Sequence, residues 1–216
     1  MAYSFTTASS QYLSSTLSSL SPYQLTISCW FNSNNITTNQ ALVYIGLSTS
    51  TSRLLLAALG ATAGDPITFD AIPSSGGAAI SVNSTTGYSA NTWNHACGVA
   101  TSATLRTVYL NGGSSGTSTT SVTPAAANRL TIGSRLSAGT PGVFMDGSIA
   151  EVGIWNASLT IDEIASLAKG MTCDKIRPQS LVFYAPLVRD LVDQKGGLTI
   201  TNNNGATVAN HPRVYA

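Results

Sequence analysis

The stretch from Val143 to Gly170 constrains the fold of this chain more than any other. Its first half alternates large apolar residues with small or polar ones, which is the pattern of a strand with one buried face. Gly147 and Gly153 interrupt this strand pattern, and glycine suits a bend or a β-bulge. The first half therefore predicts one long, locally distorted strand.

The second half of the same stretch changes to a helical period. Thr160 and Glu163 form the pattern T-x-x-E, which predicts a capping box at the start of a helix. Gly170 stands where a left-handed residue ends such a helix. We expect one short amphipathic helix near residues 160–169, in a chain whose other segments have β-strand patterns. The residues expected on its buried face are Ile161, Ile164, Ala165 and Ala168.

Two stretches carry a family resemblance. The pattern G-x-I-x-E-V-x-I-W-N-x-x-L-T-x-x-E-I, in residues Gly147–Ile164, resembles the closing signature of laminin-G-like and pentraxin-like domains. Trp93, His95 and the turn signal at Asn111 and Gly112 match a second part of that family's pattern. The resemblance implies an all-β, concanavalin A-like jelly roll of two antiparallel sheets with one short helix. This fold hosts lectins, glycanases, adhesion modules and viral structural proteins, so it does not fix a function.

Length and composition exclude several classes of protein. One jelly-roll domain is expected to use all of residues 1–216. Charged residues make up only 9% of the chain, against roughly 25% in ordinary soluble proteins. A net charge of +1 without a basic cluster argues against nucleic acid as a partner. We also expect no membrane insertion and no signal peptide, because the chain has neither a long apolar run nor a basic, apolar N-terminus.

The cysteine pattern favours free thiols. Cys29, Cys97 and Cys173 cannot all pair within one chain, and the first two stand inside apolar strand patterns. Buried free cysteines are the favoured interpretation, and a disulfide between two of them is the alternative.

Residues for catalysis are sparse. Retaining glycoside hydrolysis needs two carboxyl groups about 5–5.5 Å apart, which two acidic residues on one strand face supply. Glu151 has no acidic partner two positions away, and the whole chain has only nine Asp and Glu residues. His95 has no Ser or Asp at catalytic spacing. We therefore predict that the protein is not an enzyme.

Candidate binding residues come from a polar segment and one turn. Gly60–Ser75 is expected to be mostly loop around one short strand. Asp65, Asp70 and Tyr88 are the candidate glycan contacts. The family resemblance implies calcium at one rim in many members, held by hard oxygen ligands. Asp65, Asp70 and Asp146 are the candidate metal ligands. They match no calcium motif of the family, so a calcium site and the absence of any cofactor both stay open.

The C-terminal pattern, L-V-F-Y-A-P through H-P-R-V, resembles laminin-G-like proteins of phages and environmental bacteria. Our first hypothesis is a non-enzymatic structural module on a virion surface, made in the host cytoplasm. It would be a head-decoration or tail-associated protein, with many copies on a lattice of capsid or tail proteins. The alternative is a soluble lectin or adhesion module that binds cell-surface glycans through rim loops. Ala2–Leu13 and Thr199–Ala216 are the expected attachment arms.

Overall fold

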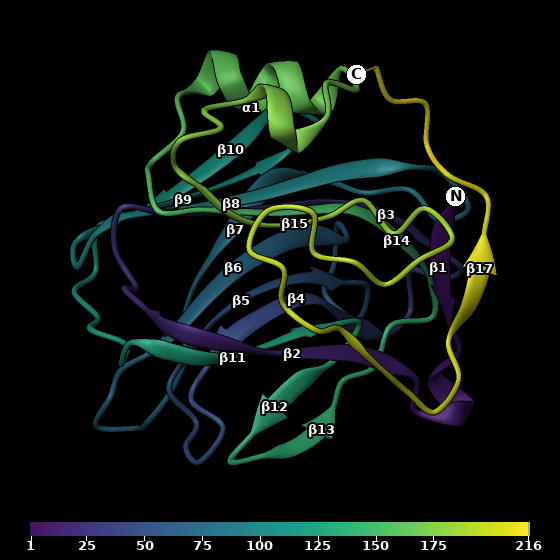
Figure 1. Cartoon of the computed structure of the whole chain (residues 1–216). Helices are drawn as coiled ribbons and strands as arrows, with labels where there is room; N and C mark the ends of the chain where they lie inside the picture. The colour runs from purple at the N-terminus through teal and green to yellow at the C-terminus, as the bar shows by residue number, and fades with distance from the viewer. Residues whose placement is uncertain (216) are drawn as a thin grey trace.

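Two antiparallel sheets, stacked face to face, form most of the molecule (Figure 1). The computed structural model describes residues 1–215. The strands of the eight-stranded sheet A are β1 (Ala2–Phe5), β3 (Leu25–Ser33), β8 (Asn94–Ser102), β9 (Leu105–Leu110), β10 (Gly113–Ser118), β14 (Gly147–Trp155), β15 (Leu181–Ala185) and β17 (Thr207–Ala209). The strands of the seven-stranded sheet B are β2 (Tyr12–Leu20), β4 (Asn39–Gly46), β5 (Arg53–Leu59), β6 (Pro66–Ile72), β7 (Ile80–Gly87), β11 (Ala127–Ile132) and β16 (Thr201–Asn203).

Smaller elements complete the fold. They are the hairpin β12 (Arg135–Ser137) and β13 (Thr140–Gly142), the helix α1 (Ile161–Ala168), and the 3₁₀ turns η1 (Thr7–Ser9) and η2 (Cys173–Lys175). Within residues 1–215, α1 is the only α-helix, so the predicted all-β jelly roll with one short helix is confirmed. No helix in these residues is long and apolar enough to cross a membrane.

Sheet order is β10-β9-β8-β3-β14-β1-β17 in sheet A, and β16-β2-β11-β4-β5-β6-β7 in sheet B. The main core lies between the sheets, where alternate residues of each strand point inward. Among its members are the fully buried rings of Phe5, Phe31, Phe69 and Phe183. Because this period assigns every other residue to the outside, it also decides which side chains are available for binding.

The long strand β14 changes partner at a bulge. Its first residues, Gly147 to Ile149, pair with β1, and its residues from Val152 onward pair with β15. Glu151 lies between these two segments with φ of 52°, a conformation that is uncommon for a residue other than glycine. The predicted distortion is therefore confirmed, but Glu151 occupies its centre rather than either glycine.

Helix α1 lies over the outer face of sheet A (Figure 1). Its capping box is confirmed, since Thr160 accepts a bond from the Glu163 amide while Glu163 accepts one from the Thr160 amide. Ile164 and Leu167 are the buried helical residues. Ile161 is 56% exposed, so its predicted place on the buried face is wrong. As the first helical residue, it lies beyond the edge of the covered surface.

The segment Gly60–Ser75 contains a full central strand, so the expectation of mostly loop is wrong. β6 pairs with β5 on one side and with β7 on the other. Ile67, Phe69 and Ala71 point into the core, and this burial outweighs the loop signals of the proline and aspartates nearby.

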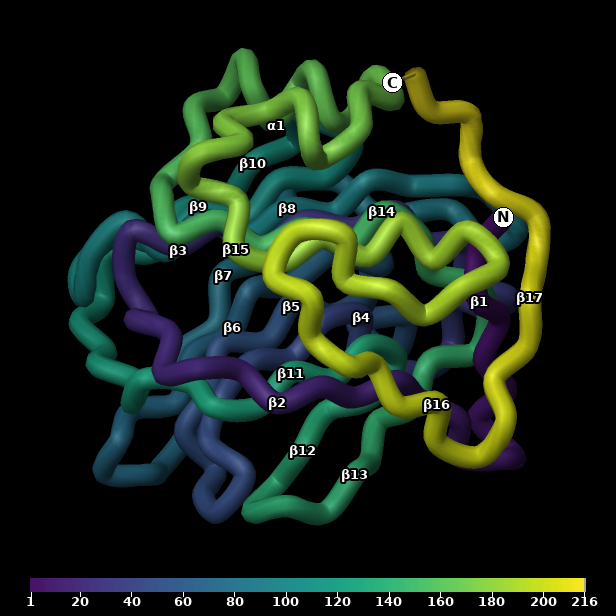
Figure 2. The backbone as a smooth tube through the Cα atoms, in the orientation of Figure 1, coloured from purple at the N-terminus to yellow at the C-terminus, as the bar shows by residue number. Residues whose placement is uncertain are grey.

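The N-terminal strand β1 and the C-terminal strand β17 lie side by side in sheet A (Figure 2). β1 lies between β14 and β17, with Ala2 and Phe5 buried. The prediction of an N-terminal attachment arm is therefore wrong. β17 is the outermost strand of sheet A, as expected for a C-terminal segment at an edge.

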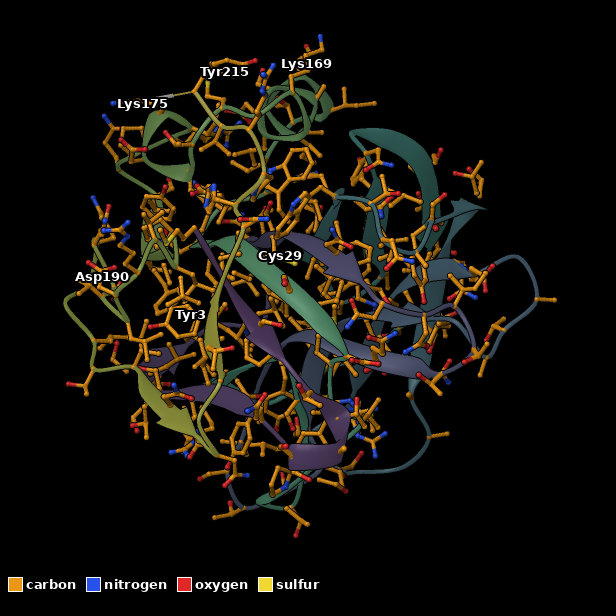
Figure 3. The ribbon with its side chains drawn as sticks, turned by 90° about the vertical axis from the view of Figure 1, so that its right-hand side faces the viewer. Tyr3, Cys29, Lys169, Lys175, Asp190 and Tyr215 are labelled. Atoms are coloured by element: carbon orange, nitrogen blue, oxygen red, sulfur yellow. The ribbon has the colours of Figure 1, made fainter. Side chains whose placement is uncertain are left out.

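All three cysteines are free and buried, as the sequence predicted. Cys29 lies in the interior of the sandwich (Figure 3). Burial raises the pKa of each thiol above its ordinary value.

Candidate functional site

The outer face of sheet B carries short polar side chains near its β16 edge. In β2, Leu13 and Leu17 are buried in the main core. Ser14 and Thr16 therefore point to the opposite face, because successive side chains of a strand alternate between faces.

Strand pairing brings the polar residues of neighbouring strands beside those of β2. Arg129 of β11 lies opposite Thr16, and Thr201 of β16 lies opposite Ser14. Leu130 follows Arg129 and enters the core, so the guanidinium is directed to the outside. Three strands from distant parts of the sequence thus place hydroxyl groups and one cation on a common surface.

These residues surround an open depression of about 360 Å³. The Asn203 amide donates to Ser14 Oγ at 3.0 Å, and Ser15 Oγ donates to the Thr199 carbonyl at 2.9 Å. Hydroxyl and amide groups of this kind can both donate to and accept from a polyhydroxylated ligand. The lining residues are Ser14, Ser15, Thr16, Arg129, Thr199, Thr201 and Asn203.

An aromatic pair borders this depression. Tyr12 lies two positions before Ser14 on the same face of β2, opposite Asn203 of β16. Its ring packs against Phe144 with a centroid separation of 6.2 Å. Tyr12 is only partly buried, so its ring adds apolar surface beside the polar groups.

Arg129 is the only charged residue among those that line the depression. Its Nη2 lies 3.5 Å from Ser14 Oγ, a contact at the long limit of a hydrogen bond. No carboxylate of the described residues lies within ion-pair distance of Arg129. The depression is therefore electropositive.

The sequence analysis predicted that Asp70 lies on a loop, but the structure places it in a strand. It is in β6 and only 7% exposed, and its two carboxylate oxygens accept from Arg53 Nε at 2.9 Å and Nη2 at 3.1 Å. A buried bidentate pair of this kind fully engages both partners. The prediction that Asp70 converges with other loop carboxylates is therefore wrong.

The remaining predicted residues lie in one connected region. The Tyr88 amide donates to the Asp65 carbonyl at 2.9 Å, and the Tyr88 hydroxyl donates to the Asn35 carbonyl at 3.2 Å. The side chain of Asn35 donates in turn to Asp146 Oδ2 at 3.2 Å. Tyr88 is 4% exposed, and burial raises its pKa. Glycan contacts at Asp65 and Tyr88 stay a prediction.

Two of the three candidate calcium ligands, Asp70 and Asp146, are engaged by other side chains. Asp146 accepts amide donors from Asn34 at 3.0 Å and from Asn35 at 3.2 Å, one on each oxygen. Asp70 is engaged by Arg53. Within residues 1–215, no three His, Cys, Asp or Glu side chains gather as a metal-binding group.

Two buried polar residues are equally unsuited to catalysis. His95 is 1% exposed and lies 2.8 Å from Ser28 Oγ, and burial lowers its pKa to about 3. Glu151 is 3% exposed, and its carboxylate contacts Tyr184 and His211 rather than a second carboxylate. A substrate reaches neither residue without a rearrangement of the fold.

The two stacked antiparallel sheets and the one short helix define a jelly roll of the concanavalin A-like type. The chain belongs to the concanavalin A-like lectin/glucanase superfamily, whose family model matches residues 6–165. No curated protein is similar enough in sequence to count as a match.

Solved structures share the fold at low sequence identity. A heptameric pentraxin from Limulus polyphemus is 14% identical, with a TM-score of 0.66 over 93% of this chain and 89% of the other. A Bacteroides ovatus protein, named as a candidate carbohydrate binding protein, is 17% identical with a TM-score of 0.65; the match covers 100% of this chain and 61% of that one. The carbohydrate-binding module CBM40 of a Ruminococcus gnavus sialidase is 14% identical, with a TM-score of 0.55 over 67% and 82% of the two chains.

The sequence reasoning missed the residues of the depression. One local signal was available. The alternation R-L-T-I directs Arg129 to the face away from the core-facing Leu130, and charged residues are few in this chain. The contribution of Thr201 and Asn203 has no local signal, since it depends on the pairing of β16 with β2.

Proposed function

We propose that this protein is a carbohydrate-binding module and that it binds sugars in the depression formed by β16, β2 and β11. The observation that carries the proposal is the lining itself, which combines hydroxyl groups, an amide and a guanidinium on an open surface. Sugars expose many hydroxyl groups that both donate and accept hydrogen bonds, and their ring faces pack on aromatic side chains. Tyr12 offers such a ring beside the polar groups.

The relatives support the same class of ligand. Two of the similar structures carry carbohydrate binding in their names, and one of these is a binding module of a sialidase rather than its catalytic part. Because the depression is open, we expect weak binding by one site, with a Kd on the order of 1 mM, which corresponds to about −4 kcal/mol. Useful affinity would then come from several copies acting together.

We propose that the module has no catalytic activity of its own. The depression is lined by no carboxylate, whereas glycoside hydrolysis ordinarily uses a pair of them. Incubation with labelled oligosaccharides is expected to leave them intact, and a shortened product that requires this protein would contradict the proposal.

The binding proposal is tested by a glycan array followed by calorimetry with the best sugar. The variant Thr16→Ala/Thr201→Ala removes two exposed hydroxyl groups from the depression, and we expect it to weaken binding about tenfold. Thr85→Ala is the matched control, because Thr85 is also exposed on sheet B but lies in β7, at the other end of the sheet. Equal affinity of the two variants for the sugar would contradict the proposal.

A location on a virion surface, with capsid or tail proteins as partners and many copies on a lattice, remains a separate prediction. The names of the relatives refer to no virus particle. Detection of the chain by mass spectrometry in purified virus particles would support this prediction. Its absence from particles made by cells that express the chain would contradict it.

A further inference from the structure

The half-buried guanidinium of Arg129 has fewer partners than the guanidinium groups of the two buried arginines, Arg53 and Arg106. Its Nε atom is enclosed and has no hydrogen-bond partner, and Nη2 has only the 3.5 Å contact to Ser14. By contrast, Arg53 is paired with Asp70 through two bonds. Arg106 donates to two backbone carbonyls and one hydroxyl. Arg129 is thus a half-buried positive charge whose donors are not satisfied by residues 1–215.

The surroundings of Arg129 supply no negative charge. The other residues of the depression are serine, threonine and asparagine. An arginine offers five N–H donors and no acceptor. The neutral hydroxyl groups can accept hydrogen bonds from it, but they do not balance its positive charge. Because Nε is enclosed, the terminal nitrogens Nη1 and Nη2 are the donors that remain for a ligand. Two parallel bonds from such a pair suit an oxyanion.

We propose that the sugar bound in the depression is acidic, with its single anionic group, a carboxylate or a sulfate, on the terminal nitrogens of Arg129. This inference rests on the proposed function and narrows its ligand class. The hydroxyl groups of Thr16 and Thr201, which flank Ser14 and Arg129 in the strand register, bond the neutral part of the sugar. The anionic group then supplies the hydrogen-bond acceptors that the guanidinium of Arg129 lacks within the fold.

Matched probes separate charge from shape in the wild-type protein. The carboxylated probes are the methyl glycosides of galacturonic acid and of N-acetylneuraminic acid, each compared with its methyl ester. The sulfated probe is galactose 6-sulfate, compared with galactose. We expect at least one acidic probe to bind about tenfold or more tightly than its neutral counterpart, since hydrogen bonds to charged groups contribute about 1.5–3 kcal/mol. The pair that shows the difference identifies the anionic group.

Variants then assign the effect to Arg129. Arg129→Gln should abolish the preference for the acidic probe, and Arg129→Lys should keep part of it. Arg135→Gln is the matched control, because Arg135 is a half-buried arginine whose Nε also lacks a partner, but it lies in β12 outside the depression. Thermal melting checks that each variant is folded. If Arg129→Gln does not fold, the comparison of acid with ester in the wild type still decides.

The outcomes separate the two proposals. If neutral probes bind as tightly as acidic ones and Thr16→Ala/Thr201→Ala weakens both, the binding site is right and the acidic ligand is wrong. If Thr16→Ala/Thr201→Ala changes the affinity for neither the acidic nor the neutral probes, the proposed site itself is wrong. Retention of the acidic preference by Arg129→Gln would also overturn the inference.

Discussion

The side chains of His211 and Glu151 meet at 3.1 Å between Nε2 and Oε1, with 11% and 4% of their surfaces exposed. Nε2 also lies 3.2 Å from the Pro186 carbonyl, and Nδ1 lies 2.9 Å from the Pro212 carbonyl. Both ring nitrogens therefore lie within hydrogen-bond distance of acceptor oxygens. The contact ties the C-terminal segment to the bulge at the centre of sheet A.

Loss of this contact should lower stability. In His211→Gln, the Glu151 carboxylate keeps its bond from the Tyr184 hydroxyl at 2.7 Å but loses its contact with the imidazole ring. Removal of one partner of a buried hydrogen bond costs about 1–3 kcal/mol. Urea unfolding of the two single variants His211→Gln and Glu151→Gln, and of the double variant, measures the coupling. A coupling below about 0.5 kcal/mol would mean that the two side chains do not act as a pair.

His95 should make the protein less stable in acid. Its pKa is about 3 when buried, against about 6.5 in the unfolded chain. The unfolded state therefore takes up a proton below pH 6.5 while the folded state does not, so stability present above pH 6.5 is lost as the pH falls toward 3. The slope reaches about 1.4 kcal/mol per pH unit.

The measurement is the free energy of unfolding in urea at pH 7, 6, 5 and 4 for wild type and His95→Gln. The carboxyl groups are common to both proteins, so the difference between the curves isolates His95. We expect the variant to have a shallower slope. Parallel curves would show that His95 is not buried in its neutral form.

Asp70→Asn should affect stability and leave sugar binding in the depression intact. The substitution leaves Arg53, which is 6% exposed, without its anion, at a cost of about 3 kcal/mol. Thermal melting measures the loss, and calorimetry below both melting temperatures measures binding. Weaker binding by folded Asp70→Asn would instead support the glycan contact that the sequence suggested.

The three cysteine thiols should be unreactive toward thiol reagents in the native state. All three cysteines are buried, and burial raises the pKa of each, so few thiolates are available for reaction. A thiol reagent such as DTNB should report no cysteine in the folded protein and three after denaturation. Rapid reaction of one thiol before unfolding would place that cysteine at the surface.

Sequence patterns predicted the features that depend on near neighbours. The capping box of Thr160 and Glu163 joins residues three positions apart, and it was predicted correctly. Asp70 was misplaced because a carboxylate between two nearby prolines, Pro66 and Pro73, is typical of a loop. Its strand position depends on Arg53, which reaches it only across the pairing of β5 with β6. Local patterns do not encode this register.

The same limit applies to the candidate site. Ser14 and Thr201 are brought together by the pairing of β2 with β16, and neither residue has a distinctive neighbourhood in the sequence. The polar outer face of β2 could be inferred from its alternation. The partner strand that completes the depression could not.

The pairing of β2 with β16 also sets a time at which the protein becomes competent to bind. During synthesis, Ser14 and Arg129 leave the ribosome before Thr199, Thr201 and Asn203, which form the remaining part of the depression. A nascent chain that still holds these last residues in the exit tunnel has an incomplete binding surface, although most of its core residues are already synthesised. In the proposed function, sugar recognition is therefore withheld until the residues of β16 have left the exit tunnel.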